Sequence, residues 1–229
     1  MTINPLVTCG TCPFCVTKQD NLCNTRQIIS MAPREGGFAE YIAMPERNLV
    51  SVPDDVALDI AALAEPIACG WHAVRKAKAV VHKKDQDIRA LVIGGGAIGL
   101  GAALSCSAQG IKNVLIIEPN ALCRSYIENH CAQLSIDPEQ LCSEDFFDLI
   151  VDGVGYENTR KLASQHAVPG GVIVHIGLGS ALGRLDIRRM TLQDITVIGT
   201  YTYADQDFRD TVQAIFERRL GPLAWTEKD

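Results

Sequence analysis

Four cysteines lie close together near the start of the sequence, in the stretch CGTCPFCVTKQDNLC. Four thiolates on a short loop suit tetrahedral zinc, and a shell closed by protein ligands leaves no position for water or substrate. The spacing C-x2-C-x2-C-x7-C therefore predicts a structural zinc site. Two disulfides and an iron–sulfur cluster are the alternatives. The predicted ligands are Cys9, Cys12, Cys15 and Cys23.

A glycine-rich segment, G-x-G-x-x-G, follows an apolar run at 88–93 and opens an Ala/Leu-rich helical stretch. Its first glycine permits a tight turn, its second lets a pyrophosphate approach the backbone, and its third allows close packing of helix on sheet. The pyrophosphate would bind the free N–H groups at the start of the helix. This context predicts a dinucleotide site, with a βαβ unit that binds no ligand as the alternative. The predicted binding residues are Gly94, Gly96, Ala97, Ile98 and Gly99.

Glu118 ends the next apolar run, 19 positions after the last glycine of the turn. A carboxylate there can accept hydrogen bonds from the adenosine ribose and would repel a 2′-phosphate, which favours NAD over NADP. Arg124 follows six positions later, and its guanidinium could reach a phosphate. We therefore include Glu118 and Arg124 among the predicted cofactor-binding residues, with NAD as the cofactor.

Further elements follow at the spacing of an α/β fold. Short apolar runs at 148–155, 170–178 and 195–199 predict parallel strands that are buried on both faces. Between the first two, residues 157–168 form a connecting helix that Pro169-Gly170-Gly171 would end. An amphipathic helix begins at Asp205, which we interpret as its cap.

Composition and charge exclude several classes of protein. Of the 229 residues, 47% are hydrophobic and 21% are charged, as in an ordinary globular protein. No apolar run is long enough to cross a bilayer, and MTINPLVTCG lacks the features of a signal peptide. A net charge of −6, without a basic cluster, argues against a nucleic-acid partner. We predict a cytoplasmic protein with no membrane or nucleic-acid partner.

Taken together, these segments resemble the zinc-dependent medium-chain alcohol dehydrogenases, and within them the polyol (sorbitol-type) and threonine dehydrogenase branch. The resemblance covers nearly the whole chain, and a four-cysteine lobe before a nucleotide unit makes it specific. It implies NAD-dependent oxidation of a secondary alcohol at a second, catalytic zinc, which acts as a Lewis acid. The segments are the cysteine cluster, GGFAEY (36–41), AEPIACGWHAV (64–74), the glycine-rich turn and FDLIVDGVG (147–155).

Glu65 occupies the position where the polyol and threonine branch has a carboxylate at or beside the catalytic zinc. The resemblance therefore implies that Glu65 is a catalytic residue and a metal ligand. The alternative is a partly exposed carboxylate before a proline, since a buried one would need a partner. We interpret His72 as a packing or hydrogen-bonded histidine rather than a ligand.

The family pattern is incomplete, because no Gly-His-Glu segment occurs anywhere in the sequence. Glu65 alone is too few ligands for a catalytic zinc, which uses three from the protein. We therefore expect a chain truncated at both ends that oxidises no polyol by itself. The alternatives are a naturally short reading frame, a non-catalytic NAD-binding interaction module stabilised by zinc, and a zinc-free quinone or enone reductase relative.

The predicted fold class is α/β, a doubly wound parallel sheet of Rossmann type beside an incomplete, mainly β GroES-like domain. We expect residues 1–75 to be the remnant of the GroES-like catalytic domain, 76–200 the NAD-binding domain, and 201–229 a partial return segment. The resemblance implies a small alcohol or polyol as substrate, whose identity stays open, and a homo-oligomer, either a dimer or a tetramer.

Overall fold

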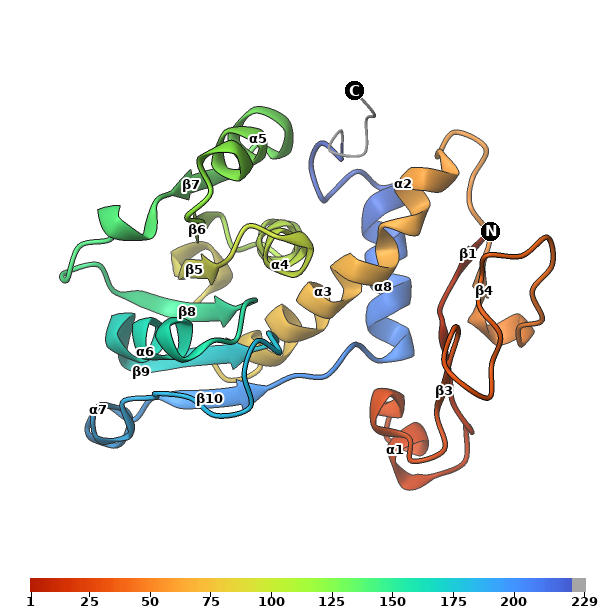
Figure 1. The fold of residues 1–229 in the computed structure, drawn as a ribbon, viewed down its shortest axis with the longest axis horizontal. Helices are drawn as coiled ribbons and strands as arrows, with labels where there is room; N and C mark the ends of the chain where they lie inside the picture. The colour runs from red at the N-terminus through yellow and green to blue at the C-terminus, as the bar shows by residue number, and fades with distance from the viewer. Residues whose placement is uncertain (224–229) are drawn as a thin grey trace.

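The computed structural model describes residues 1–223, so residues 224–229 at the end of the expected return segment lie outside the described part. A six-stranded parallel sheet with strand order β10-β9-β8-β5-β6-β7 forms the centre of the larger half (Figure 1). This arrangement confirms the predicted α/β class. The strands are β5 (Arg89–Ile93), β6 (Asn113–Ile117), β7 (Leu134–Ile136), β8 (Phe147–Asp152), β9 (Ala167–His175) and β10 (Thr196–Gly199).

Helices cover both faces of this sheet, because its strands are apolar on both sides. In β5, Ala90 and Val92 face a core cluster that includes residues of α3, α4, α5 and α8. The intervening Leu91 and Ile93 belong to a second cluster on the opposite face, where α6 packs. The helices are α3 (Ala64–Lys78), α4 (Ala97–Ala108), α5 (Ala121–Cys131), α6 (Glu157–His166), α7 (Ile187–Leu192) and α8 (Asp205–Phe216).

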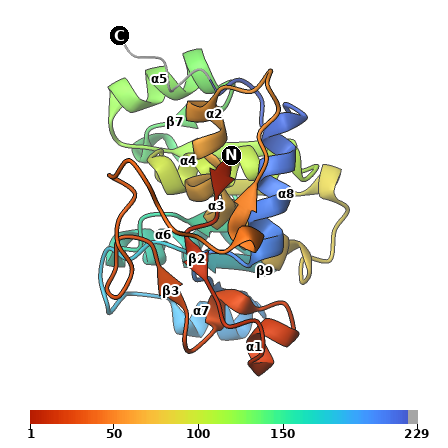
Figure 2. The same ribbon diagram turned by 90° about the vertical axis from the view of Figure 1, so that its right-hand side faces the viewer.

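The first 62 residues form small elements that face the sheet across α3 and α8 (Figure 1). Figure 2 looks onto these segments, with the sheet behind them. The antiparallel pairs are β1 (Thr2–Ile3) with β4 (Leu49–Val50) and β2 (Leu6–Val7) with β3 (Gln27–Ile28). The short helices are α1 (Pro13–Val16) and α2 (Leu58–Ala62), and single 3₁₀ turns lie at Asp20–Leu22, Glu46–Asn48, Asp85–Asp87 and Pro138–Gln140.

Two local predictions were wrong. The helix expected at 157–168 ends at His166, and Pro169-Gly170-Gly171 lie within β9, because Ala167 already pairs with Phe147 of the neighbouring strand. The helix α8 does begin at Asp205, but the cap position is Ala204, whose N–H donates to Asp207 Oδ2 at 3.1 Å. Asp207, and not Asp205, therefore supplies the carboxylate that accepts an N–H group at the start of the helix.

A close crossing of α3 over α4 joins the N-terminal segments to the sheet. A Cβ atom at Gly70 would lie 2.5 Å from the backbone nitrogen of Ala102, and one at Gly101 would lie 3.2 Å from Ile67 Cα. Glycine is therefore required sterically at the centre of the crossing, because these neighbours are backbone atoms that cannot move alone.

Within residues 1–223, no helix is both long and apolar enough to cross a membrane.

We expect Gly70→Ala to lower the free energy of unfolding by about 1–3 kcal/mol, because the added methyl group overpacks the crossing. The matched control is Gly37→Ala, since no atom lies within 4 Å of a Cβ built there. Chemical denaturation of both variants gives the two free energies. Equal stability of the two variants would contradict the steric account.

Candidate functional site

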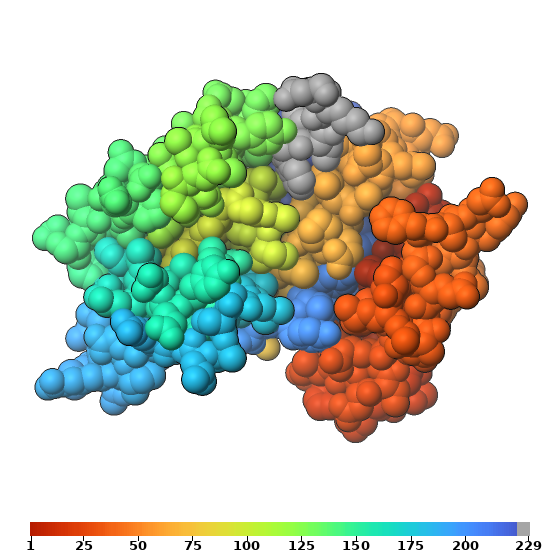
Figure 3. Space-filling view, in the orientation of Figure 1, coloured from red at the N-terminus to blue at the C-terminus, as the bar shows by residue number. Residues whose placement is uncertain are grey.

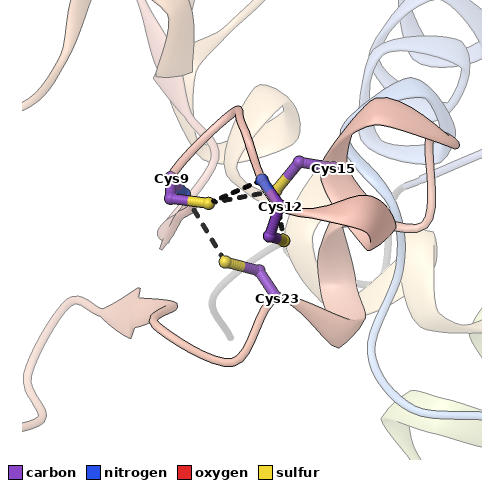
Figure 4. A group of neighbouring side chains, drawn as sticks. All are labelled: Cys9, Cys12, Cys15 and Cys23. Carbon is purple, nitrogen blue, oxygen red and sulfur yellow. Dashed lines mark hydrogen bonds between the residues drawn. The ribbon is translucent and has the colours of Figure 1, made fainter.

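The four predicted zinc ligands come together in one cluster (Figure 4). Their sulfur atoms all lie within 4.8 Å of one another, with Cys12 Sγ and Cys15 Sγ at 3.5 Å. A zinc ion bound to four sulfurs at about 2.3 Å requires sulfur separations of about 3.8 Å, so the cluster fits tetrahedral Zn²⁺ with little adjustment. Among residues 1–223 it is the one group of three or more potential ligands found together.

Backbone geometry prepares this cluster for a metal. The N–H groups of Thr11 and Cys12 donate to Cys9 Sγ at 3.4 and 3.3 Å. These bonds lower the pKa of the Cys9 thiol to about 5, so it is a thiolate at neutral pH. Partial burial and the neighbouring sulfurs raise the pKa of Cys15 to about 12. A bound zinc ion would oppose that rise, because it binds the deprotonated form.

The cysteine lobe, which we define as residues 9–23, is fastened to the segment that leads from the sheet into α8. Asn21 Nδ2 donates to the carbonyl of Tyr201 at 2.8 Å. The N–H of Asp205 donates to Asp20 Oδ2 at 3.1 Å. Asn4 Nδ2, just before the lobe, also reaches Asp205 Oδ1 at 3.0 Å. The lobe is therefore positioned by residues about 180 places later in the chain.

The glycine-rich turn connects β5 to α4. Gly94 has a φ of +95°, which favours glycine, and a Cβ at Gly99 would lie 1.9 Å from the carbonyl oxygen of Gly94. At Gly96, by contrast, a Cβ would meet no atom within 4 Å. Helix α4 begins at Ala97, so the N–H groups of Ala97 and Ile98 have no partner within the helix. The turn thus combines free donors with open space.

Glu118 folds back onto this turn. Its Oε2 accepts the N–H of Gly95 at 2.8 Å, and its Oε1 accepts the N–H of Asn120 at 2.9 Å. Arg124 donates to the Glu118 carbonyl at 2.6 Å and forms an ion pair with Asp137 at 3.0 Å. The structure therefore brings the predicted acid to the turn, while the guanidinium of Arg124 is already paired with a carboxylate.

A second close approach, which was not predicted from the sequence, lies between the loops that follow β8 and β9. Gly155 has a φ of +80°, and a Cβ there would lie 2.2 Å from the Gly177 carbonyl oxygen. The fully buried Asp152 holds this crossing, since its Oδ1 accepts the N–H of Gly155 at 2.9 Å and its Oδ2 accepts the hydroxyl of Thr159 at 2.9 Å. The sequence signal that could have indicated this approach is a glycine shortly after each strand, Gly155 after β8 and Gly177 after β9.

Glu65 lies in the first turn of α3 and is exposed. Its Oε1 accepts a hydrogen bond from the hydroxyl of Tyr203 at 2.9 Å. Burial, followed by the charge of Glu65, raises the pKa of that tyrosine above its ordinary range. Within residues 1–223, Glu65 does not join a group of three potential metal ligands. The sequence carried no signal for this pair, which is separated by 138 positions.

His72 is a hydrogen-bonded histidine, as predicted. Its Nδ1 lies 2.7 Å from Asp207 Oδ2, and Arg75 Nε donates to Asp207 Oδ1 at 2.5 Å. Although burial raises the pKa of Asp207, the bonds from His72 and Arg75 outweigh desolvation and lower it to about 2. The three side chains form a paired ionic cluster between α3 and α8.

Comparison with known proteins identifies the family. The model described as "Zinc-binding dehydrogenase" matches residues 97–217, which is more than half of the chain, and the model "Alcohol dehydrogenase GroES-like domain" matches residues 1–54. The chain therefore belongs to the zinc-binding dehydrogenase family, and the predicted family and GroES-like character are confirmed.

Individual relatives agree with this assignment. A protein of Saccharomyces cerevisiae described as "Probable diacetyl reductase ((R)-acetoin forming) 2" is 31% identical over 95% of this chain and 54% of the relative. L-galactonate-5-dehydrogenase of Escherichia coli is 27% identical over 94% of this chain and 64% of the relative. The chain thus spans about half to two thirds of the length of these relatives.

Solved structures show the same fold. The crystal structure of L-idonate 5-dehydrogenase from Escherichia coli superimposes with a TM-score of 0.86 at 21% identity, covering 96% of this chain and 65% of that one. Galactitol-1-phosphate dehydrogenase from Escherichia coli gives a TM-score of 0.80 at 26% identity, covering 95% and 66%.

We expect the purified chain to hold one zinc ion, because the sulfur separations suit a four-thiolate shell. The double variant Cys12→Ser/Cys15→Ser should lose the metal, whereas Cys123→Ser, an exposed cysteine outside the cluster, should retain it. Elemental analysis measures the metal content. Iron with visible absorption, or two disulfides in the intact mass, would instead establish one of the alternatives.

We expect Asp207→Asn to lower the free energy of unfolding by about 3 kcal/mol at pH 7, because it breaks a buried ion pair. The folded pKa of Asp207 is depressed from 3.8 to about 2, so its stabilisation is present above pH 3.8 and is lost as pH falls toward 2. Denaturation of wild type and variant between pH 7 and pH 3 should show a shrinking difference. The exposed control Asp54→Asn should show a small difference in the free energy of unfolding at every pH. A large difference for Asp207→Asn that stays constant with pH would refute the electrostatic origin of its stabilisation.

Proposed function

We propose that this chain is part of a zinc-dependent oxidoreductase that transfers hydride from a secondary alcohol or polyol to NAD. The observation that carries the proposal is the turn at the start of α4, where Gly96 leaves open space beside the free N–H groups of Ala97 and Ile98. A pyrophosphate needs both a close backbone approach and unpaired donors. Membership of the zinc-binding dehydrogenase family supports the same assignment.

Glu118 supports NAD rather than NADP in this proposal. Its two carboxylate oxygens already accept backbone N–H bonds at the turn, which fixes a negative charge there. A carboxylate oxygen has a second lone pair that can accept a ribose hydroxyl, whereas the 2′-phosphate of NADP would be repelled. Arg124 gives little compensation for that repulsion, because Asp137 neutralises its charge at 3.0 Å.

We further propose that Cys9, Cys12, Cys15 and Cys23 hold a structural zinc ion, and that Glu65 acts at a catalytic zinc in the complete site. When bound, the catalytic zinc would polarise the alcohol oxygen. Glu65 is the single member of that site proposed from this chain, and catalytic zinc sites use three protein ligands. We therefore expect the 229-residue chain alone to show no zinc-dependent alcohol oxidation.

We also propose a substrate class, a compartment, an oligomeric state and domain bounds for this chain. The substrate would be a small alcohol or polyol, and a reducing cytoplasm would keep the clustered thiols available for metal. A dimer or tetramer is supported by highly exposed apolar side chains near the edge strand β10, including Leu178 (93% exposed), Leu182 (81%) and Leu192 (68%). We propose 1–75 as the catalytic-domain remnant, 76–200 as the cofactor domain and 201–229 as the return segment.

The substitution Gly96→Val tests the cofactor site without disturbing the fold. The φ of Gly96 is −72°, which valine tolerates, and its Cβ meets open space. We therefore expect unchanged stability but NADH binding weakened about tenfold or more, because the side chain would occupy the space of the pyrophosphate. Titration calorimetry with NADH and NADPH measures the affinities, and Gly37→Val is the control. Unaltered NADH binding by Gly96→Val would overturn the proposed site, and tighter binding of NADPH would overturn the choice of NAD.

A further inference from the structure

A groove of about 700 Å³ separates the cysteine lobe from the β10 edge of the sheet. Figure 3 shows the hollow between the lobe, at the lower right, and the lower edge of the sheet. Residues 17–22 form one wall, the last two turns of α3 form the second, and the ends of β9 and β10 form the third. This volume lies in the range of small-molecule sites.

The charges that line this groove are all of one sign. Lys18 enters from the cysteine lobe, and Arg75 and Lys76 enter from α3. His72 and His175 also line the groove, but burial lowers the pKa of His175, whose Nε2 accepts a hydrogen bond from Arg160, so this imidazole adds no positive charge at neutral pH. No aspartate or glutamate lines it within the described part of the chain. Such a surface is unusual on a chain with a net charge of −6. Single-sign charge in a concave site focuses the electrostatic potential and attracts the opposite charge.

Two of these cations have no carboxylate of their own. Arg75 and His72 share the buried carboxylate of Asp207, and Lys78, on the adjoining turn of α3, is paired with Asp85 at 2.8 Å. Lys18 and Lys76 form no ion pair with any residue in 1–223. The groove therefore keeps an uncompensated positive charge from two different elements.

The walls also offer a neutral donor and apolar surface. Tyr201 contributes a hydroxyl group, whereas the hydroxyls of Thr17 and Thr200 already donate to backbone carbonyls. Apolar side chains come from Leu22 and Ile198. A hydroxyl donor beside two ammonium groups suits the several oxygens of a phosphate group better than a neutral sugar. The apolar surface suits a small organic body attached to that group.

We propose that this groove binds a small organic phosphate, with Lys18 and Lys76 as the residues that contact the anion. The groove lies apart from the glycine-rich turn, because none of the residues 94–99 lines it. It adds an anionic ligand that neither the zinc cluster nor the dinucleotide turn requires.

Inorganic phosphate is the probe, added to the 229-residue chain while the amide signals of an NMR spectrum are followed. We expect saturable shifts at Lys76 and Tyr201. The double variant Lys18→Gln/Lys76→Gln should bind phosphate about fivefold more weakly, because it removes both unpaired ammonium groups and exposed ion pairs are individually weak. The matched control is Lys112→Gln, an exposed lysine at the start of β6 that does not line the groove.

Three outcomes would overturn the proposal. The first is phosphate shifts confined to residues 94–99, and the second is an equal affinity in wild type and the double variant. The third is an equal response to neutral sorbitol, which would mean that the groove does not select for charge. Thermal denaturation of the double variant checks that it remains folded.

Discussion

The carboxylate of Asp207 is the contact on which the placement of α3 against α8 depends. It is fully buried and accepts hydrogen bonds from His72 and Arg75 of α3 and from the N–H of Ala204, just before α8. A buried charge is tolerated only when it is paired and hydrogen-bonded. Few other arrangements of α3 against α8 would satisfy this group, so the ionic cluster fixes the register of the two helices.

The register of α3 against α8 also determines where Glu65 and the cysteine lobe lie. Because α3 starts at Ala64 and α8 follows the segment 200–204, fixing the two helices brings the Tyr203 hydroxyl to Glu65. The same segment accepts Asn21 through the Tyr201 carbonyl, and Asp205 donates to Asp20, which seats the cysteine lobe. One buried carboxylate thus orients Glu65 and the proposed structural zinc site, although it belongs to neither.

The sequence predicted the local patterns and missed the long-range pairs. The cysteine cluster and the turn at Gly94 were predictable because their residues are close in the chain and their spacing reflects local geometry. The helix was predicted to continue to residue 168, but it ends at His166 because Ala167 pairs with Phe147 of β8. This tertiary contact places proline and glycine inside a strand, against their usual preference for turns. The partners of Glu65 and His72, by contrast, lie 138 and 135 positions away, where no periodicity connects them.

The cysteine cluster also affects the cationic groove, although its four ligands are proposed to close the metal site to substrate. Lys18 lies between Cys15 and Cys23, with a left-handed φ of +58°, so the fold of the cysteine lobe determines where its ammonium group lies. A short loop with little apolar surface has few packing contacts to hold such a conformation, and a bound metal would supply folding free energy. Loss of the metal would then free Lys18 and loosen the contacts of Asp20 and Asn21 with α8. The proposed structural zinc would therefore control one wall of the cationic groove without touching a ligand bound there.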